Sequence, residues 1–260
     1  MKFRRLKHII GKFNKSDLRN SKDLRIRKND VFLVSYPKSG NTWMRFLLIN
    51  SVFNKDKSLV SYNDLEKYIP SIHRSSKADI DNIKGFRIIK SHFVKKEYPK
   101  IVYLIRDGRD ALVSYYFFQK DVYDFQGTFA EFYFHEGYGK IGSWDKHVKK
   151  ALDYQINNPD NIIIIRYEDL INDTENTLIN VLNFLGQKTT PKQLAWAIEN
   201  SSFHKLQKMQ SEEAIVIDDK NVNFFRKGRS NQWPSYFTEK MLLDFELKAG
   251  DILNQFKYSN

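Results

Sequence analysis

The sequence predicts an α/β protein in which helices flank a central parallel sheet, and three observations predict this fold class. Four short, mostly apolar runs rich in β-branched residues lie at 31–35, 86–90, 101–105 and 161–166. Helical patterns of apolar residues occur between them, as expected when helices cover both faces of a parallel sheet. The 260 residues contain no internal repeat and no Gly/Ser-rich or Pro-rich linker, which suits a single domain with one large core.

The first predicted strand is the VFLVS run at 31–35, which stops at Tyr36-Pro37. After the short segment PKSGNT, an apolar pattern resumes as WMRFLLINSVF. This change of period predicts a strand, a tight loop and a helix in direct succession.

Three further strands are predicted. FRIIK at 86–90 ends at Ser91-His92, and IVYLI at 101–105 leads into the loop RDGRD and a helical ALVSYYFFQ. NIIIIR at 161–166 precedes YEDLINDTENTLINVLNFLG, which we predict to be one helix closing at Gly186. Because ligands of parallel sheets bind outside the carboxyl ends of the strands, the residues after each strand are the candidates for a functional site.

The composition excludes several classes of protein. Cysteine is absent, which rules out disulfides, thiolate metal sites and a cysteine nucleophile. Hydrophobic residues at 41% and charged residues at 28% are typical of a globular chain rather than a disordered one. The longest apolar runs, such as 46–49 and 162–165, are far shorter than the roughly 20 residues of a membrane-spanning helix. With no signal-peptide pattern at the basic start, a cytoplasmic protein is expected.

Most of the net charge of +12 lies in an N-terminal arm, residues 1–28, ahead of the predicted domain at 29–260. The arm holds 11 lysines and arginines against Asp17 and Asp23, so it carries +9 and leaves only +3 for the rest. Apolar residues recur at helix spacing within it. Two interpretations stay open: a helix lying on an anionic surface, or a solvated arm docked on the domain. The nearly balanced body gives no reason to expect nucleic-acid binding.

The loop after the first strand is the first candidate site. In YPKSGNTW, at 36–43, Gly40 stands among small polar residues at the start of a helix. Backbone N–H groups and the helix dipole attract phosphate there, and Lys38 adds a full positive charge. The loop is not of the Walker A type, because its only lysine precedes its only glycine. An ordinary strand-to-helix turn is the alternative interpretation.

A second phosphate site is predicted after the third strand. Arg106 follows that strand directly, and Ser114 lies two helical turns further on, where its hydroxyl can reach the same oxygens. Alternatively, Arg106 pairs with Asp107 or Asp110. Two phosphate sites at neighbouring strand ends predict a ligand with two separated phosphate groups.

These segments resemble the two cofactor motifs of the sulfotransferase family, whose sulfuryl donor is 3′-phosphoadenosine 5′-phosphosulfate (PAPS). YPKSGNTW and IVYLIRDGRDALVSYY are similar to those motifs, and IIKSH at 88–92 resembles the segment with the family's catalytic histidine. GSWDKHV, IRYEDL and FFRKGRSNQW follow in the family's order over about residues 30–240, and GSWDKHV resembles the cytosolic, small-molecule branch. The resemblance implies the sulfotransferase fold and PAPS-dependent sulfuryl transfer that leaves 3′-phosphoadenosine 5′-phosphate (PAP).

The resemblance also implies which residues bind the donor. The 5′-phosphosulfate would be held by Lys38, Ser39, Gly40, Asn41 and Thr42. Adenine would be contacted by Trp43, through stacking, and by Tyr167 and Ser201. The 3′-phosphate would be bound by Arg106, Ser114, Arg226, Lys227 and Gly228. Without the motifs, Trp43 and Tyr167 would be read as half-buried core aromatics.

Three residues are implied in the chemistry. His92 is the candidate general base, because an imidazole can take a proton near neutral pH. Lys38 lies where it could neutralise the bridging oxygen as the S–O bond breaks, and Lys90, on the same face of its strand as His92, could reach the sulfuryl oxygens. The histidines have no metal-ligand spacing, so no bound metal is expected.

The sequence departs from the family pattern in three places that bear on the site and the assembly. Asn41 stands where family members commonly have a threonine, and it keeps a hydrogen-bonding side chain. The usual Gly-Asp-Trp is replaced by Asn231-Gln232-Trp233, and asparagine tolerates the left-handed backbone that the missing glycine would adopt. Pro234 and Leu243 stand where the cytosolic branch often carries dimerisation residues, which leaves the oligomeric state open.

The acceptor is expected to be a small molecule with a hydroxyl or amine, and a phenol is one candidate. Aromatic residues are dense beside the predicted site, from Tyr116 to Phe134, and either line a pocket or form plain core. Two other functions are kept as alternatives: an ATP-dependent kinase with a divergent phosphate loop, and a protein that binds an anionic surface through the N-terminal arm.

Overall fold

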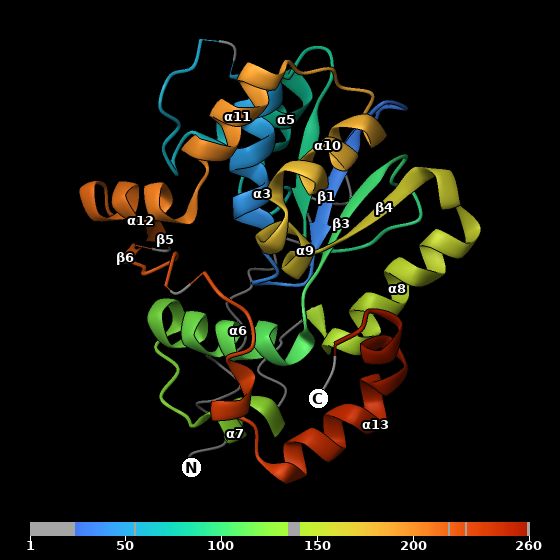
Figure 1. Cartoon of the computed structure of the whole chain (residues 1–260), viewed down its shortest axis with the longest axis vertical. Helices are drawn as coiled ribbons and strands as arrows, with labels where there is room; N and C mark the ends of the chain where they lie inside the picture. The colour runs from blue at the N-terminus through green and yellow to red at the C-terminus, as the bar shows by residue number, and fades with distance from the viewer. Residues whose placement is uncertain (1–23, 55, 135–140, 218, 227, 259–260) are drawn as a thin grey trace.

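A computed structural model of the chain describes residues 24–258, apart from 55, 135–140, 218 and 227. At its centre lies a four-stranded parallel sheet in the order β2-β1-β3-β4 (Figure 1). The strands are β1 (Val31–Ser35), β2 (Ile88–Ser91), β3 (Ile101–Ile105) and β4 (Ile162–Arg166). The predicted α/β class with a central parallel sheet is confirmed.

Helices, short helical turns and a small hairpin lie between and after these strands in the chain. The described elements are α3 (Asn41–Leu48), the π-helical turn η2 (Ile49–Phe53), α4 (Leu65–Tyr68), α5 (Lys77–Asn82), α6 (Gly108–Tyr123), α7 (Phe129–Phe134), α8 (Trp144–Asn157), the 3₁₀ turn η4 (Pro159–Asn161), α9 (Tyr167–Asn172), α10 (Thr174–Phe184), α11 (Pro191–Asn200), α12 (Phe203–Glu212), the hairpin strands β5 (Val216–Ile217) and β6 (Lys220–Asn221), the 3₁₀ turn η5 (Trp233–Ser235) and α13 (Glu239–Gln255).

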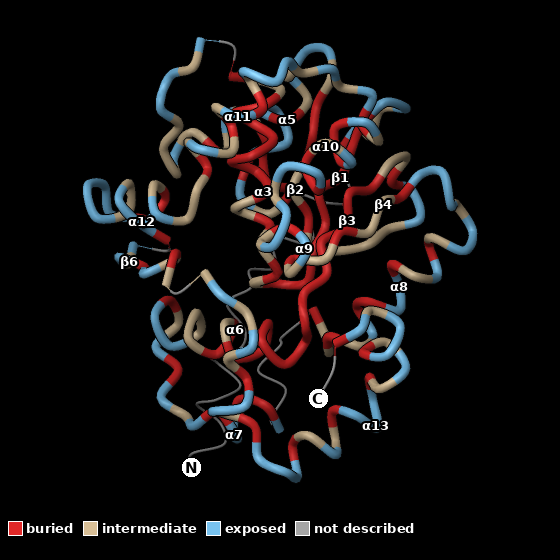
Figure 2. Tube along the Cα trace, viewed as in Figure 1, coloured by how far each residue is buried: buried red, intermediate tan, exposed pale blue. Residues whose placement is uncertain are grey.

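The sheet separates two apolar cores. Alternate residues of a strand point to opposite faces, so Phe32 and Val34 pack in one core while Val31 and Leu33 pack in the other. Side chains from α6, α8 and α13 join the first core, and side chains from α3, α10 and α11 join the second. The buried strands run through the middle of the molecule, with the exposed helix faces outside them (Figure 2).

Several element boundaries differ from the prediction, among them the start of α6 at Gly108, inside the predicted RDGRD loop, and the start of β4 at Ile162. The single helix predicted over 167–186 is two helices, α9 and α10, because Asp173 has a non-helical backbone and its carboxylate accepts a hydrogen bond from the amide of Asn176. This makes Asp173 an N-cap that starts a new helix. The second strand begins at Ile88, opposite Val31, and the preceding Arg87 forms a buried ion pair with Asp30 at 2.6 Å.

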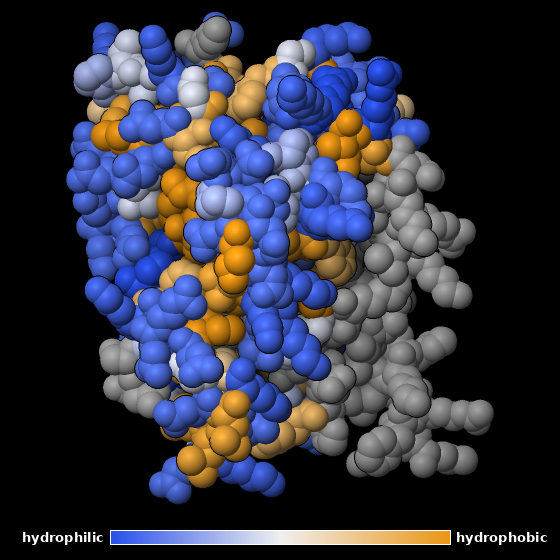
Figure 3. Space-filling model, turned by 90° about the vertical axis from the view of Figure 1, so that its right-hand side faces the viewer, coloured by the Kyte–Doolittle hydropathy of each residue, from blue (hydrophilic) through white to orange (hydrophobic). Residues whose placement is uncertain are grey.

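Only the end of the N-terminal arm is described, because residues 1–23 lie outside the described residues. Leu24 packs at the edge of a core, and the Arg27 guanidinium donates to the carbonyls of Asp81 and Ile83 at 2.6 and 2.7 Å. Residues 24–28 are therefore packed on the body of the protein. Of the helices that are described, none is both long and apolar enough to cross a bilayer. The described part of the face in Figure 3 is mostly hydrophilic, with apolar groups between hydrophilic residues.

Candidate active site

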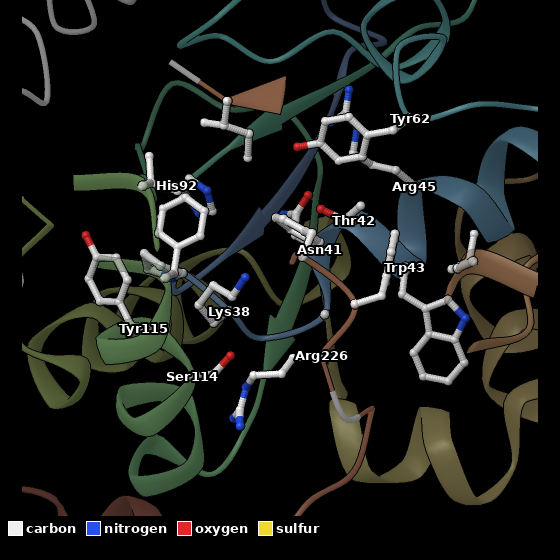
Figure 4. Close-up of a pocket in the computed structure, with 18 of the residues that line it drawn as sticks. Lys38, Asn41, Thr42, Trp43, Arg45, Tyr62, His92, Ser114, Tyr115 and Arg226 are labelled. Atoms are coloured by element: carbon white, nitrogen blue, oxygen red, sulfur yellow. The ribbon is translucent and has the colours of Figure 1, made fainter. Parts of the chain in front are cut away.

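A cavity of about 1150 Å³ lies beyond the carboxyl ends of β1, β2 and β3 (Figure 4). Most residues that the sequence places at the site line it: Lys38, Gly40, Asn41, Thr42, Trp43, Lys90, His92, Arg106, Ser114, Tyr167, Arg226 and Gly228. Ser39 and Ser201 are fully buried and are not among the lining residues, and Lys227 lies outside the described residues. Segments more than 190 residues apart in sequence thus meet in one cavity.

The loop between β1 and α3 has a backbone that few residues adopt. Lys38 and Gly40 both have positive φ, at 68° and 92°. A Cβ on Gly40 would come within 2.6 Å of the Tyr167 ring, so both the conformation and the close approach require glycine. The Ser39 hydroxyl and the Asn41 side-chain oxygen are buried with no hydrogen-bond partner among the described residues. Buried polar groups without partners are uncommon and mark a place where a polar ligand fits.

Arg106 connects the loop between β1 and α3 to the C-terminal segment around Arg229. Its guanidinium donates to the carbonyls of Lys38 and Arg229, each at 3.1 Å, and lies 4.6 Å from the centre of the Tyr167 ring. The alternative pairing is present as well, since Asp110 lies 3.6 Å away. Arg106 Nε is buried without a partner, so the side chain keeps donor capacity for an anion at the cavity wall.

The carboxylate of Asp110 fixes the C-terminal loop against α6. It accepts hydrogen bonds from the backbone amides of Asn231, Gln232 and Trp233 at 2.6, 2.8 and 3.0 Å. Asn231 has a φ of 59°, the left-handed backbone expected where the family has glycine. Asp110 thus holds the loop that carries Gly228 beside the cavity, and a Cβ on Gly228 would come within 2.4 Å of Phe203.

Replacing Asp110 with asparagine is expected to weaken PAP binding by on the order of tenfold, because the amide loses one acceptor oxygen and places a donor against backbone N–H groups. Equilibrium titration with PAP measures the effect, and a thermal melt establishes that the variant is folded. Asp153→Asn removes an exposed carboxylate from α8 and serves as the control. A folded Asp110→Asn protein with the control's affinity would contradict this positioning role.

Trp43 and Ser201 meet, although only one of them faces the cavity. The Trp43 indole N–H donates to the Ser201 carbonyl at 2.8 Å, and the indole meets the Tyr167 ring edge-on with centroids 6.0 Å apart. The Ser201 hydroxyl is turned into the interior and accepts from Asn50 at 3.0 Å. Ser201 thus reaches the cavity wall through its carbonyl contact with Trp43, and its predicted contact with adenine stays a prediction.

The position and tautomer of His92 are fixed by its neighbours. Its Nδ1 lies 2.9 Å from the Ser35 carbonyl, which can only accept, so Nδ1 carries the proton and Nε2 keeps a free lone pair. Burial is the main cause that lowers the pKa of His92 well below its ordinary value, and the charge of Lys90 lowers it further. His92 is therefore neutral at neutral pH, with one nitrogen able to accept a proton.

Two further histidines, His73 and His147, contact the His92 backbone. His73 Nε2 accepts from the His92 amide at 3.3 Å, and His147 Nε2 lies 2.8 Å from the His92 carbonyl. Tyr103 donates to the other nitrogen of His147 at 2.8 Å. Burial lowers the pKa of His73 to about 3 and that of His147 to about 4, so both are neutral. No local pattern near 73 or 147 signals these contacts, which arise only when separate segments fold together.

Lys38 reaches the cavity from the loop after β1, and Lys90 reaches it from the neighbouring strand β2. Lys38 Nζ lies 3.9 Å from the centre of the Phe224 ring and 4.7 Å from that of Phe118. Burial is the main cause that lowers the pKa of Lys38 to about 7, and the charges of Arg106 and Arg226 add to it while Asp121 opposes it. A bound anion would offset the repulsion among Lys38, Arg106 and Arg226, so this group of cations suits an anionic ligand.

The aromatic-rich segment divides between cavity and core. Phe118 and Tyr123 line the cavity, whereas Tyr116, Phe125 and Phe132 pack in the core. Further lining residues that the sequence analysis did not single out are Arg45, Tyr62, His73, Arg74, Phe203, Leu206, Ile217, Phe224 and Phe225. Arg45, Phe224 and Phe225 lie in or next to segments that the motifs identify, whereas the others lie outside those motifs and are brought to the site by the tertiary structure. Within the described residues, no group of three or more acidic or histidine side chains is placed to hold a metal ion.

The buried, unpartnered Ser39, Asn41 and Arg106 atoms and the cationic walls together fit a ligand with two anionic ends. A family model described as "Sulfotransferase domain" matches residues 28–250. The chain belongs to the sulfotransferase family. It is therefore an enzyme, and this membership agrees with the order of the motifs.

Relatives of this sulfotransferase cover most of its length. It is 29% identical over 245 residues to sulfotransferase 2A2 of Rattus norvegicus, covering 87% of this chain and 85% of the relative. It is 30% identical over 247 residues to flavonol 3-sulfotransferase of Flaveria bidentis, covering 82% and 78%.

Solved structures share the fold of this sulfotransferase. Mouse sulfotransferase SULT7A1 complexed with PAP has a TM-score of 0.73 at 24% identity, with 95% of each chain covered. A retinol dehydratase in complex with androsterone and the inactive cofactor PAP has a TM-score of 0.68 at 24% identity, covering 91% of this chain and 85% of that one. These likenesses confirm the predicted sulfotransferase fold.

Proposed function

We propose that this sulfotransferase moves a sulfuryl group from PAPS to a hydroxyl, or an amine, of a small acceptor by in-line transfer. The observation that carries the proposal is the meeting of His92, Lys38 and Lys90 with the phosphate loop in one cavity. PAPS supplies the sulfuryl group and leaves as PAP. The PAP-bound neighbours support the same donor.

The chain offers separate groups for the two ends of the donor. The Lys38–Thr42 loop and the start of α3 provide N–H groups and a cation for the 5′-phosphosulfate. Arg106, Ser114 and Arg226 would bind the 3′-phosphate, since all three line the cavity and Figure 4 shows Ser114 and Arg226 on the same side of Lys38. Trp43 and Tyr167 would contact the adenine, which would lie between their rings and the Lys38–Thr42 loop.

His92 would act as the general base through Nε2. It takes the proton of the acceptor hydroxyl while that oxygen bonds to sulfur, and the electron pair of the breaking S–O bond goes to the 5′-phosphate of PAP. The Ser35 carbonyl accepts from Nδ1 before and after this step, so the same hydrogen bond stabilises the imidazolium that forms.

Lys38 and Lys90 would stabilise the charge that develops during transfer. Lys38 lies in the phosphate loop and would neutralise the leaving oxygen, whereas Lys90, two residues before His92 on β2, faces the same cavity and would contact the sulfuryl oxygens. Preorganised charges of this kind supply most of the rate in such group transfers.

Of the two alternatives, the kinase is disfavoured by the family membership and by the loop, which lacks a lysine after its glycine. Binding of an anionic surface by the N-terminal arm depends mostly on residues 1–23, which lie outside the described residues. A phenolic acceptor is supported by Phe118 and Tyr123, which give the cavity an aromatic wall.

The donor assignment predicts a clear order of nucleotide affinity. PAP is expected to bind at least about tenfold more tightly than AMP or ATP, because only PAP has a phosphate on the 3′ side for Arg106 and Arg226. Thermal-shift titrations with the three nucleotides measure this order. Equal affinities, or a preference for ATP that requires Mg²⁺, would contradict the proposal.

A further inference from the structure

The donor contacts proposed above leave two polar side chains of the cavity wall unused. Tyr62 and Arg74 both line the cavity, and Arg74 donates to the Tyr62 hydroxyl at a long 3.4 Å. Figure 4 shows Tyr62 beside Arg45, on the far side of Asn41 and Thr42 from Ser114 and Arg226. The two residues therefore lie away from the end proposed for the 3′-phosphate.

The charge on Arg74 is not neutralised by an acid among the described residues. The carboxylate in the vicinity, Glu66, is held by Arg45 at 3.0 Å, by the Ser71 amide at 2.7 Å and by the Ser75 hydroxyl at 2.7 Å. Burial alone would raise the pKa of Glu66, but Arg45 and these hydrogen bonds outweigh it and lower the pKa. Glu66 is thus ionised, but its charge is taken up by Arg45, and Arg74 has no ion pair there.

Two further titratable groups lie near Glu66. His73 is neutral, since burial lowers its pKa to about 3, and the Lys90 side chain acts on both Glu66 and His73 as a cation. Arg45, Arg74 and Lys90 thus surround the carboxylate of Glu66, while the other carboxylates of the cavity lining, Asp124 and Asp219, come from different segments and Asp124 pairs with Lys220. An uncharged acceptor would not use the charge of Arg74, whereas an anion would.

Tyr62 adds a hydrogen-bond donor at the same place. Burial is the main cause that raises its pKa, which outweighs the nearby Arg74 and Arg45, so the phenol stays protonated. Its oxygen accepts from Arg74, which leaves its own proton to donate. A guanidinium beside a hydroxyl donor matches the two oxygens of a carboxylate.

Arg74 and the proposed base open onto the same cavity. Arg74 directly follows His73, whose Nε2 lies 3.3 Å from the His92 amide nitrogen. An acceptor in this cavity could therefore place its hydroxyl at His92 and an anionic group at Arg74.

We propose that Arg74 and Tyr62 form a subsite for a carboxylate on the acceptor, so that the preferred acceptor is a small hydroxylated carboxylic acid. The inference rests on the proposed function, because it concerns the acceptor of that same site.

The experiment compares 3-(4-hydroxyphenyl)propanoate with its uncharged amide, which share one phenol and differ in the anion. Calorimetric titration into PAP-saturated protein gives their affinities, and PAPS-dependent sulfation gives kcat/KM for each. The acid is expected to be favoured by on the order of tenfold in both, a modest figure because Arg74 is exposed to solvent. Arg74→Gln should bring both ratios close to one, Tyr62→Phe should reduce them, and Arg74→Lys should keep part of the preference.

Lys77→Gln removes an exposed cation three residues beyond Arg74, outside the cavity lining, and is the control for a general loss of positive charge. Equal binding of acid and amide by the wild-type protein, or an undiminished preference in Arg74→Gln, would overturn the subsite. If the acid binds preferentially through Arg74 but neither compound is sulfated, the subsite is supported and the proposed transfer to phenols fails. The binding and turnover readouts thus separate the two proposals.

Discussion

Replacing His92 with alanine is expected to lower kcat by on the order of 100-fold or more while PAP still binds. The reason is geometric: Nδ1 is engaged by the Ser35 carbonyl at 2.9 Å, so Nε2 is the nitrogen that can accept the acceptor's proton. Single-turnover measurements with saturating PAPS isolate this step, and a thermal shift with PAP shows that the donor site is intact. His204→Ala, at an exposed histidine of α12, is the matched control and should keep wild-type turnover.

The pH dependence gives an independent check on His92. A general base acts in its unprotonated form, and burial lowers the pKa of His92 well below 6.5. Acidification to about pH 6.5 should therefore leave kcat unchanged, whereas a histidine of ordinary pKa would be half protonated there. A rate that falls by half at that pH, or a His92→Ala protein with normal turnover, would refute the role of His92 as base.

Replacing Lys38 with methionine is expected to lower kcat by on the order of 100-fold, because the charge that would meet the leaving oxygen is lost from a site shielded by Phe118 and Phe224. PAPS-saturated turnover measures the effect. Lys57→Met is a matched control, since Lys57 is another lysine with a left-handed backbone, at φ 54°, and is not among the cavity-lining residues. Loss of PAP affinity with an unchanged kcat would make Lys38 a binding residue only.

The same side chain predicts how PAP binding depends on pH. The pKa of Lys38 is about 7, lowered mainly by burial, and an anion binds more tightly to the protonated form. PAP affinity should therefore fall as the pH rises above about 7, and binding there should take up a proton because the anion raises the Lys38 pKa. Calorimetry in buffers of different ionisation enthalpy measures the uptake. Lys38→Met should show neither effect, and a wild-type affinity independent of pH would contradict the assignment.

Much of the fold and of the donor site could be predicted from local patterns. Apolar runs at 31–35 and 101–105 identify buried strands because each has to be apolar on both faces, and both were observed with those bounds. The YPKSGNTW loop follows from its glycine, since Gly40 needs both a positive φ and room beside Tyr167. Such requirements act within a few residues, so the sequence displays them.

The acceptor end could not be predicted in the same way. His73, His147 and Arg74 have ordinary neighbours in sequence, and their roles come from contacts across 19 to 55 residues, such as His73 to His92 and His147 to His92. Likewise, the Ser201 hydroxyl accepts a hydrogen bond from Asn50 and does not face the cavity. The packing between α3, η2 and α11 determines this orientation.

The sequence by itself determined the parallel sheet and singled out the two loops proposed to bind phosphate and the candidate base at its edge, because each is encoded in the residue types of one short segment. Only the tertiary structure decided the tautomer of His92, the lowered pKa of Lys38 and the place of Arg74 in the cavity wall. These properties depend on burial and on charges from distant segments, and no single segment contains either.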